Sequence, residues 1–352
     1  MFVPTGLPRC RMTITPDAPD HPSASRAWEH FSSMGSPRYI CAPMVDGSEL
    51  AFRQLVRRYG VQLAYTPMLH SANFVRCPQF RREHFTTCAG DRPLVAQFCG
   101  NQPEVVLQAA RYVEDHVDAV DLNLGCPQHI ARRGHYGAFL QDDWELVARI
   151  VRTLRDGCRV PVWCKIRVFD DVPRTLQYAQ MLQEAGCSVL AVHGRTREQK
   201  GQTPGPANWD TIRAIKQHLR IPVLMNGNVQ SWADVQRGLA ETGTDGVLSA
   251  DRLLAYPALF SGREGIPVRQ LAHEYLECVR SYDPSTSPKI IRSHLFRLFQ
   301  DEARVNVQLR DGLLDAQSVD AFERLLHAVK PADAEAALQS EDHKASLPAP
   351  RR

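Results

Sequence analysis

Short apolar segments alternate with longer amphipathic segments along most of this chain. The candidate strands are residues 39–44, 62–66, 94–98, 119–124, 162–167, 189–193, 223–226 and 246–249. The candidate helices between them are residues 49–59, 103–116, 144–155, 173–185, 208–218 and 231–242. This alternation favours parallel strands joined by crossover helices, and about eight such units are the number that closes a barrel.

An open, doubly wound sheet would show the same alternation, so the residues after the first strand matter. A dinucleotide-binding sheet needs a GxGxxG turn there, and this chain has residues 42–47, APMVDG, which lack that pattern. Polar residues also follow several strands at their carboxyl ends, which a barrel gathers around one mouth. They are Gln97, Asn123, Lys165, His193 and Asn226. We therefore predict a (β/α)8 TIM barrel over residues 36–262.

The alternation stops after Pro257, and residues 263–330 have apolar positions at helical spacing only. This indicates a separate, all-helical C-terminal domain. Its first half carries more basic than acidic side chains: Lys289, Arg292, His294, Arg297, Arg304 and Arg310 against Asp301 and Glu302. Residues 331–352 are rich in Ala, Glu, Ser and Pro, so we expect a disordered tail. We expect a flexible extension over residues 1–35.

The bulk composition changes this picture little. The chain has 352 residues, 43% hydrophobic and 23% charged, and a formal net charge of +3, which is too small to indicate nucleic-acid binding without local patches. The ten cysteines show no CxxC spacing, so we expect reduced thiols and residence inside the cell, in the cytoplasm or the nucleus, with mitochondria left open. No uncharged apolar run reaches the roughly 18 to 20 residues that span a bilayer. We expect a monomer that needs neither a membrane nor a metal ion.

Candidate chemistry lies at the predicted mouth. Cys126 belongs to the loop that follows a strand in residues 121–128, DLNLGCPQ, where a thiol is a candidate acid or nucleophile; the alternative is a buried structural cysteine. Lys165 in a strand interior needs an anion or an acceptor, unless a neighbouring carboxylate pairs with it. The amides of Gln97 and Asn123 suit the edges of a heterocycle such as a flavin or uracil, although satisfied core amides are common.

Two further loops predict a phosphate site. Residues 226–229, NGNV, precede a predicted helix, and residues 249–252, SADR, follow the last strand. The seventh and eighth loops of barrels often bind phosphate through backbone amides and a helix N-terminus. A dinucleotide enzyme would need more than these two loops, so the phosphate site points to a mononucleotide such as FMN; an ordinary Asn-Gly turn is the alternative.

These residues occur within longer segments that resemble the tRNA-dihydrouridine synthase family, in particular its eukaryotic branch acting at positions 16 and 17 of tRNA. The resemblance runs from residue 36 to about residue 260, roughly two thirds of the chain. Its segments are APMVDGSELAFR at 42–53, YTPMLHS at 65–71, PLVAQFCGN at 93–101, DLNLGCPQHIARRGHYGAFL at 121–140, KIR at 165–167, HGRTREQKG at 193–201 and NGN at 226–228.

The resemblance implies a set of FMN contacts and a role for Cys126 as the catalytic acid. The implied FMN contacts are Pro43, Met44, Gln97, Lys165, His193, Asn226, Gly227, Asn228, Ala250 and Asp251. One position departs from the family pattern: Arg252 stands where family members usually have glycine, which puts close backbone approach to the phosphate in doubt unless the arginine side chain replaces it.

The reaction implied is reduction of FMN by NADPH, hydride transfer to carbon 6 of uracil, and protonation of carbon 5 by Cys126. Asn123, Lys165, His193 and Arg195 would hold the uracil carbonyls. The base must be flipped out of the tRNA, so phosphate contacts have to offset that cost. The candidates for these contacts are Arg76, Arg81, Arg82, Arg132, Arg133 and the basic run from Lys289 to Arg310, which includes Arg292 and Arg297.

Three alternatives stay open at this stage. The basic run of the helical domain is also consistent with a solvated helix face. A different FMN barrel acting on a free pyrimidine, such as a dihydroorotate dehydrogenase, would share the barrel features without needing that run. A tRNA-binding protein without catalysis is the third alternative, and intact Cys126 and Lys165 argue against it.

Overall fold

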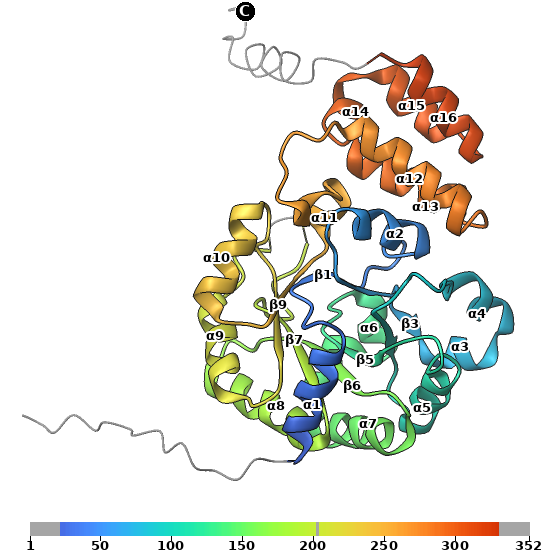
Figure 1. The fold of residues 1–352 in the computed structure, drawn as a ribbon. Helices are drawn as coiled ribbons and strands as arrows, with labels where there is room; N and C mark the ends of the chain where they lie inside the picture. Colours follow the sequence, from blue (N-terminus) through green and yellow to red (C-terminus); the bar gives the residue numbers. More distant parts are fainter. Residues whose placement is uncertain (1–21, 202–203, 331–352) are drawn as a thin grey trace, which may run out of the picture.

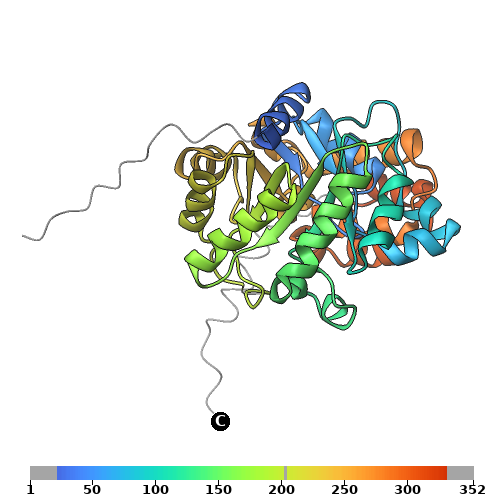
Figure 2. The same cartoon turned by 90° about the horizontal axis from the view of Figure 1, so that it is seen from below.

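The computed structural model describes residues 22–201 and 204–330 and contains a closed parallel barrel (Figures 1 and 2). The barrel strands are β1 (Tyr39–Cys41), β2 (Leu63–Tyr65), β4 (Leu94–Cys99), β5 (Ala119–Leu124), β6 (Val162–Arg167), β7 (Val189–His193), β8 (Val223–Asn226) and β9 (Gly246–Ser249). Each pairs in parallel with the next, and β9 pairs with β1, which closes the ring. The predicted TIM barrel is confirmed.

Amphipathic helices surround the barrel. They are α2 (Leu50–Arg58), α5 (Pro103–Arg111), α7 (Trp144–Gly157), α8 (Val172–Ala185), α9 (Trp209–His218) and α10 (Trp232–Thr242). Short polar residues set several of their starts, because the side chains of Asp143, Asn208 and Ser231 accept hydrogen bonds from the first turns of α7, α9 and α10. The described residues include no helix long and apolar enough to cross a bilayer.

The barrel interior changes from apolar to polar along the strands. An apolar cluster that includes Tyr65, Trp163 and Leu224 fills its lower part. Since side chains alternate with a period of two, Asp121 and Asn123 of β5 face the same side, as do Lys165 and Arg167 of β6. Asn123 lies beside Lys165, and Arg167 lies beside His193. The strand register therefore brings the polar residues together at the carboxyl ends.

The expectation of a flexible extension over residues 1–35 is wrong for residues 22–33. Residues 22–33 lie within the segment expected to be flexible, and they form helix α1 (Pro22–Ser33). Its Phe31 is 1% exposed and packs with the barrel interior, 6.5 Å from Trp163 between ring centroids. Trp28 donates a hydrogen bond from Nε1 to the Arg220 carbonyl at 2.7 Å. Apolar residues at helical spacing explain this helix; residues 1–21 and the tail from 331 lie outside the described residues.

Several short elements were not predicted because they have too few residues for a periodic signal. They are β3 (Leu69–His70), α3 (Ser71–Arg76) and α4 (Pro78–His84), all between β2 and β4. Short helical turns also occur in the loops after β5 and β9: α6 (His129–Arg133), η1 (Gly137–Asp142) and α11 (Asp251–Ala255). A further turn, η2 (Leu259–Ser261), lies at the amino end of β1, where Phe260 stacks on Tyr39 at 5.4 Å between ring centroids.

The C-terminal helices pack on the barrel at α2 (Figure 1, orange and red). They are α12 (Val268–Tyr282), α13 (Pro288–Leu298), α14 (Glu302–Val305), α15 (Val307–Asp315) and α16 (Val319–Ala328). The carboxylate of Glu49, just before α2, is the buried polar link across this interface. It accepts from the Tyr275 hydroxyl at 2.9 Å and lies 2.9 Å from His294 Nε2.

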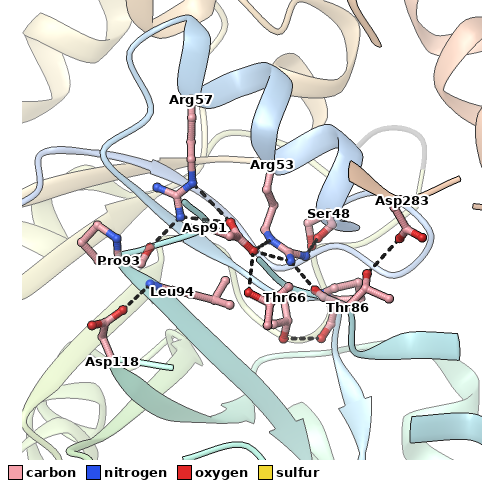
Figure 3. A network of polar contacts seen from close by, with 12 residues as sticks. Ser48, Arg53, Arg57, Thr66, Thr86, Asp91, Pro93, Leu94, Asp118 and Asp283 are labelled. Carbon is pink, nitrogen blue, oxygen red and sulfur yellow. Dashed lines mark hydrogen bonds and ion pairs between the residues drawn. The ribbon is translucent and has the colours of Figure 1, made fainter. Parts of the chain in front are cut away.

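A second polar link runs through a buried ion pair (Figure 3). Arg53 of α2 contacts Asp91 Oδ2 from Nε at 2.9 Å and from Nη2 at 2.6 Å, and its Nη2 also donates to the Thr86 carbonyl. The Thr86 hydroxyl in turn donates to Asp283 Oδ2 at 2.9 Å, at the end of α12. The segment before β4 thus connects α2 of the barrel to the helical domain.

Candidate active site

The loop that carries Cys126 is held from three sides. The Asn123 side-chain oxygen accepts hydrogen bonds from the backbone N–H groups of Gly125 at 3.2 Å and Cys126 at 2.9 Å. Arg167 donates from Nε to the Gly125 carbonyl at 2.9 Å. The Ala138 N–H donates to the Cys126 carbonyl at 3.0 Å, and a Cβ at neighbouring Gly137 would lie 2.7 Å from that oxygen. The position of Cys126 is therefore defined by contacts on both of its peptide groups.

The Cys126 side chain is half-buried. It packs against an apolar cluster that includes Cys99, Ala131 and Tyr136, with Met68 and Phe139 at its edge. The predicted alternative of a fully buried structural cysteine does not describe this side chain.

Lys165 lies on the neighbouring strand without a carboxylate partner. Its Nζ donates to Asn226 Oδ1 at 3.0 Å, and among the described residues it forms no ion pair. Burial lowers the pKa of Lys165 to about 8, and the charge of Arg167 adds to this, whereas Asp121 and Cys126 act in the opposite direction. An ammonium group in this position favours a ligand with an oxygen or nitrogen acceptor, as the sequence predicts.

His193 is neutral in this arrangement. Because a guanidinium group can only donate, the 3.1 Å contact from Arg195 Nη1 makes His193 Nε2 an acceptor and leaves the proton on Nδ1. Burial, together with the charges of Lys165, Arg167 and Arg195, lowers the pKa of His193 to about 2. Arg195 also donates to Asn228 Oδ1 at 2.6 Å. His193 is therefore a hydrogen-bonding group and not a proton donor at neutral pH.

The loops predicted to bind phosphate adopt special backbone conformations. Gly227 has φ of 109°, and a Cβ there would lie 2.8 Å from Ala207 Cβ and 2.9 Å from His193 Cδ2, so only glycine fits. Asn228 is left-handed as well, with φ of 59°. Ala250 and Asp251 stand at the start of α11. Arg252, the departure from the family pattern, lies over the Tyr256 ring at 5.5 Å, and its buried Nε has no hydrogen-bond partner among the described residues.

Pro43 and Met44 follow β1 and are half-buried. The Met44 backbone is fixed by the Ser48 side chain, since its N–H donates to Ser48 Oγ at 3.0 Å and its carbonyl accepts from that hydroxyl at 3.2 Å. The structure thus places both residues at the carboxyl end of β1, on the same rim as the other predicted contacts.

The predicted RNA-contacting residues that reach the loops of the barrel form two groups, whereas Arg76, Arg81 and Arg82 lie on α3 and α4, where Arg81 donates to the carbonyls of Phe74 and Val75 at 2.6 and 2.9 Å. Arg132 and Arg133 are exposed on α6, just after the Cys126 loop. Arg132 also lines a cavity of about 480 Å³ with Phe139 and Arg197. These residues are close in the chain to the candidate acid.

The second group lies on α13. Exposed Lys289 contacts Asp46 at 3.0 Å, and Arg297 contacts Asp251 at 3.1 Å, so both side chains reach the loops of the barrel. Arg292 points elsewhere: it donates to the carbonyls of Leu313 and Ala316 at 2.9 and 2.8 Å and thereby caps α15.

Two polar residues of the mouth were given no role by the sequence argument. Asp121 accepts from Gln97 Nε2 at 2.8 Å beneath Asn123, and Arg167 reaches the carbonyls of Gly125, Thr196 and Gln199. Each stands two residues from a predicted site residue on the same strand. The period of two was the signal that would have assigned both to the mouth.

Comparisons with known proteins show the family of this chain. The family model described as "Dihydrouridine synthase (Dus)" matches residues 40–332. A mouse protein named tRNA-dihydrouridine(16/17) synthase (NAD(P)(+))-like is 49% identical over 300 residues, which cover 85% of this chain and 62% of the mouse protein. The tRNA-dihydrouridine(16/17) synthase (NAD(P)(+)) of Saccharomyces cerevisiae is 45% identical over 283 residues, covering 77% of this chain and 67% of the yeast protein. A human tRNA-dihydrouridine(20a/20b) synthase (NAD(P)+)-like protein is 42% identical over 233 residues, covering 65% of this chain and 73% of its own length. The chain spans less than two thirds of the length of the mouse relative. The chain therefore belongs to the dihydrouridine synthase family.

Proposed function

We propose that this protein reduces uridine to 5,6-dihydrouridine in tRNA, with FMN as its cofactor and NADPH as its reductant. Positions 16 and 17 are the proposed targets, because the mouse and yeast relatives carry these positions in their names. The single observation on which the proposal depends most is the half-buried Cys126, held on its loop beside the basic group formed by Lys165, Arg167 and Arg195.

The residues at the mouth fit an FMN molecule by their chemistry. Lys165 has no anionic partner among the described residues, and Arg252 offers an unused buried Nε in the loop proposed for phosphate. Neutral His193 and the Asn226 amide add groups suited to the carbonyls and nitrogens of a flavin ring. Lys165, His193 and Asn226 would hold the ring, and Gly227, Asn228, Ala250 and Asp251 would surround the phosphate. Gln97 can still contribute, because its engaged amide keeps one donor and one acceptor position.

The bound flavin would supply the hydride for carbon 6 of uracil. The protein must then provide a proton at carbon 5, and Cys126 is the candidate donor. His193 is unsuitable, since a group with a pKa of about 2 carries no second proton at neutral pH. Lys165 and Arg195 would stabilise the negative charge that develops on the uracil carbonyls. The Asn123 oxygen is occupied by the two N–H groups of the Cys126 loop, whereas its NH2 group gives one hydrogen to Gln97 and keeps one for a uracil carbonyl, so Asn123 would both hold the loop and donate to the substrate.

The tRNA would be held by basic groups around the mouth. Arg132 and Arg133, exposed on α6 just after the Cys126 loop, would contact the backbone next to a flipped nucleotide, and Lys289 and Arg297 of α13 would add contacts from the helical domain. The ion pairs that Lys289 and Arg297 make with Asp46 and Asp251 are exposed, and phosphate can replace such partners at little cost.

The test is a reaction of the purified protein with tRNA that lacks dihydrouridine. We expect flavin absorption, and a mass increase at position 16 or 17 when NADPH is supplied. NADH, free uracil and dihydroorotate serve as separate arms. A protein without flavin that binds tRNA but never reduces it would contradict the proposal, and so would turnover of a free pyrimidine without turnover of tRNA.

A further inference from the structure

Three buried side chains form a continuous hydrogen-bonded line beneath the Cys126 loop. Gln97 Nε2 donates to Asp121 Oδ2 at 2.8 Å, and Asn123 Nδ2 donates to Gln97 Oε1 at 2.8 Å. The other end of the Asn123 amide accepts from the Gly125 and Cys126 N–H groups. Asp121, Gln97 and Asn123 are only 1%, 0% and 8% exposed, so water does not compete for these bonds.

The direction of this line is fixed at both ends. Backbone N–H groups can only donate, so the Asn123 oxygen has to face the Cys126 loop and its NH2 group has to face Gln97. The Gln97 oxygen then faces Asn123, and its NH2 group faces position 121, where an acceptor is required. Asp121 Oδ2 is that acceptor, and because the ionised carboxylate cannot donate, Asp121 opposes the reversed orientation of the two amides.

Asp121 is also a costly residue at this position. It lies beside Trp163 in the barrel interior, and its second oxygen, Oδ1, has no hydrogen-bond partner among the described residues. Burial raises the pKa of Asp121 to about 7, although the hydrogen bond from Gln97 and the charge of Lys165 act against this. Packing alone would be served by an apolar side chain, as at Trp163, the residue in register with Asp121 on β6.

We propose that Asp121 is a positioning residue for the reaction: through Gln97 and Asn123 it fixes the loop that presents the Cys126 thiol. This inference rests on the proposed function for the identity of the reaction. Asp121 does not touch the substrate in this account and acts only through the two amides.

Exchange of the amide and the carboxylate tests this directly. In D121N the amide introduced at position 121 has two possible orientations. If its NH2 group donates to Gln97, the line of hydrogen bonds reverses and the Cys126 N–H loses its acceptor. If its oxygen accepts from Gln97, the line is kept but a buried NH2 group is left unpaired. In Q97E the carboxylate introduced at position 97 faces the carboxylate of Asp121, so the hydrogen bond between these two positions is replaced by repulsion of like charges. The double variant D121N/Q97E restores the direction, because the carboxylate introduced at position 97 accepts both from the amide introduced at position 121 and from Asn123. D118N is the matched control, since Asp118 accepts from the Leu94 N–H at the opposite end of β5.

The measurements are kcat and KM for tRNA, flavin content, thermal unfolding, and the rate at which iodoacetamide alkylates Cys126, read by peptide mass against exposed Cys77. We expect D121N to lower kcat by roughly 10- to 100-fold while KM changes less than about twofold, as for a reacting group displaced by about 1 Å. Alkylation of Cys126 should change in D121N and remain at the wild-type rate in D118N. The double variant should exceed both single variants in kcat.

Wild-type kcat and wild-type alkylation in D121N would overturn the proposal, and so would a double variant no better than Q97E. If D121N does not fold, the comparison of Q97E with the double variant decides. If the wild type itself leaves tRNA unreduced, the proposed function fails, and the alkylation rates still decide whether Asp121 sets the loop.

Discussion

Replacement of Glu49 by alanine should separate the helical domain from the barrel. Glu49 is the buried acceptor for Tyr275 of α12 and the partner of His294 of α13. The His294 ring also stacks on Phe52, at 4.6 Å between centroids, and Glu49 and His294 are 8% and 2% exposed. Glu49→Ala leaves the Tyr275 hydroxyl and His294 buried without their partner. Removal of one member of a buried pair typically costs about 3–5 kcal/mol, and we expect a loss of unfolding free energy in that range.

The pH dependence of this contact has a definite sign. Burial raises the pKa of Glu49, but the charge of His294 and the hydrogen bonds from His294 and Tyr275 outweigh burial and hold that pKa below its usual value of 4.5. A carboxylate with a depressed pKa contributes its stability above the unfolded value and loses it as the pH falls through the folded value. The difference in stability between wild type and Glu49→Ala should therefore shrink below about pH 4.5.

Urea unfolding followed by two probes measures the effect. All five tryptophans, at positions 28, 144, 163, 209 and 232, precede the helical domain, so their fluorescence reports on the barrel, whereas circular dichroism reports on all helices. In Glu49→Ala we expect helical signal to be lost before the fluorescence changes. Glu277→Ala is the control, because the Arg58–Glu277 pair joins the same helices with the glutamate 60% exposed, and such pairs contribute about 0–1 kcal/mol. Coincident transitions and a loss below about 1 kcal/mol in Glu49→Ala would refute the reasoning.

Three further predictions concern other parts of the molecule. Lys165→Met should lose flavin. The flavin-free variant should be more stable than the flavin-free wild type at pH 7 by up to about 3 kcal/mol, since the folded pKa of Lys165, about 8, lies below the ordinary 10.5. For the same reason the unfolding free energy of the wild type should rise between pH 8 and pH 10.5, and a flat profile in urea titrations would contradict this. Phe31→Ala should cost about 3–5 kcal/mol in the same titrations and leave kcat unchanged; an unaltered midpoint would show that α1 does not stabilise the barrel. Lys289→Glu and Arg297→Glu should each raise KM for tRNA and reduce the slope of log Kd against log salt by about one. Arg310→Glu is the control, because among the described residues Arg310 pairs with the neighbouring Asp311 of α15; unchanged salt slopes in the α13 variants would remove α13 from the RNA interface.

The sequence predicted the barrel well where strands are fully buried. The bounds of β5 to β9 agree with the prediction, because apolar runs of this kind end abruptly at polar mouth residues. The prediction failed for α1, whose apolar positions pack into the barrel only through tertiary contacts with residues such as Trp163. It also missed α3 and α4, which are too short to show a period.

The candidate site was predicted at the level of single strand ends. Gln97, Asn123, Lys165, His193 and Asn226 all occupy the mouth that their positions indicated. What a sequence does not contain is which neighbour each side chain engages. The line from Asp121 to the Cys126 loop depends on the register between β4 and β5, and the capping of α15 by Arg292 depends on how α13 and α15 pack.

The central claim is that Cys126 supplies the proton for carbon 5 of uracil from its held loop. The most direct test compares wild type and Cys126→Ala, both with matched flavin content, on tRNA that lacks dihydrouridine, with NADPH in excess and the product mapped by mass. We predict reduction at position 16 or 17 by the wild type and a rate lower by about 10²- to 10⁴-fold in the variant, the usual contribution of a positioned acid. Equal rates of product formation by the two proteins would contradict the claim.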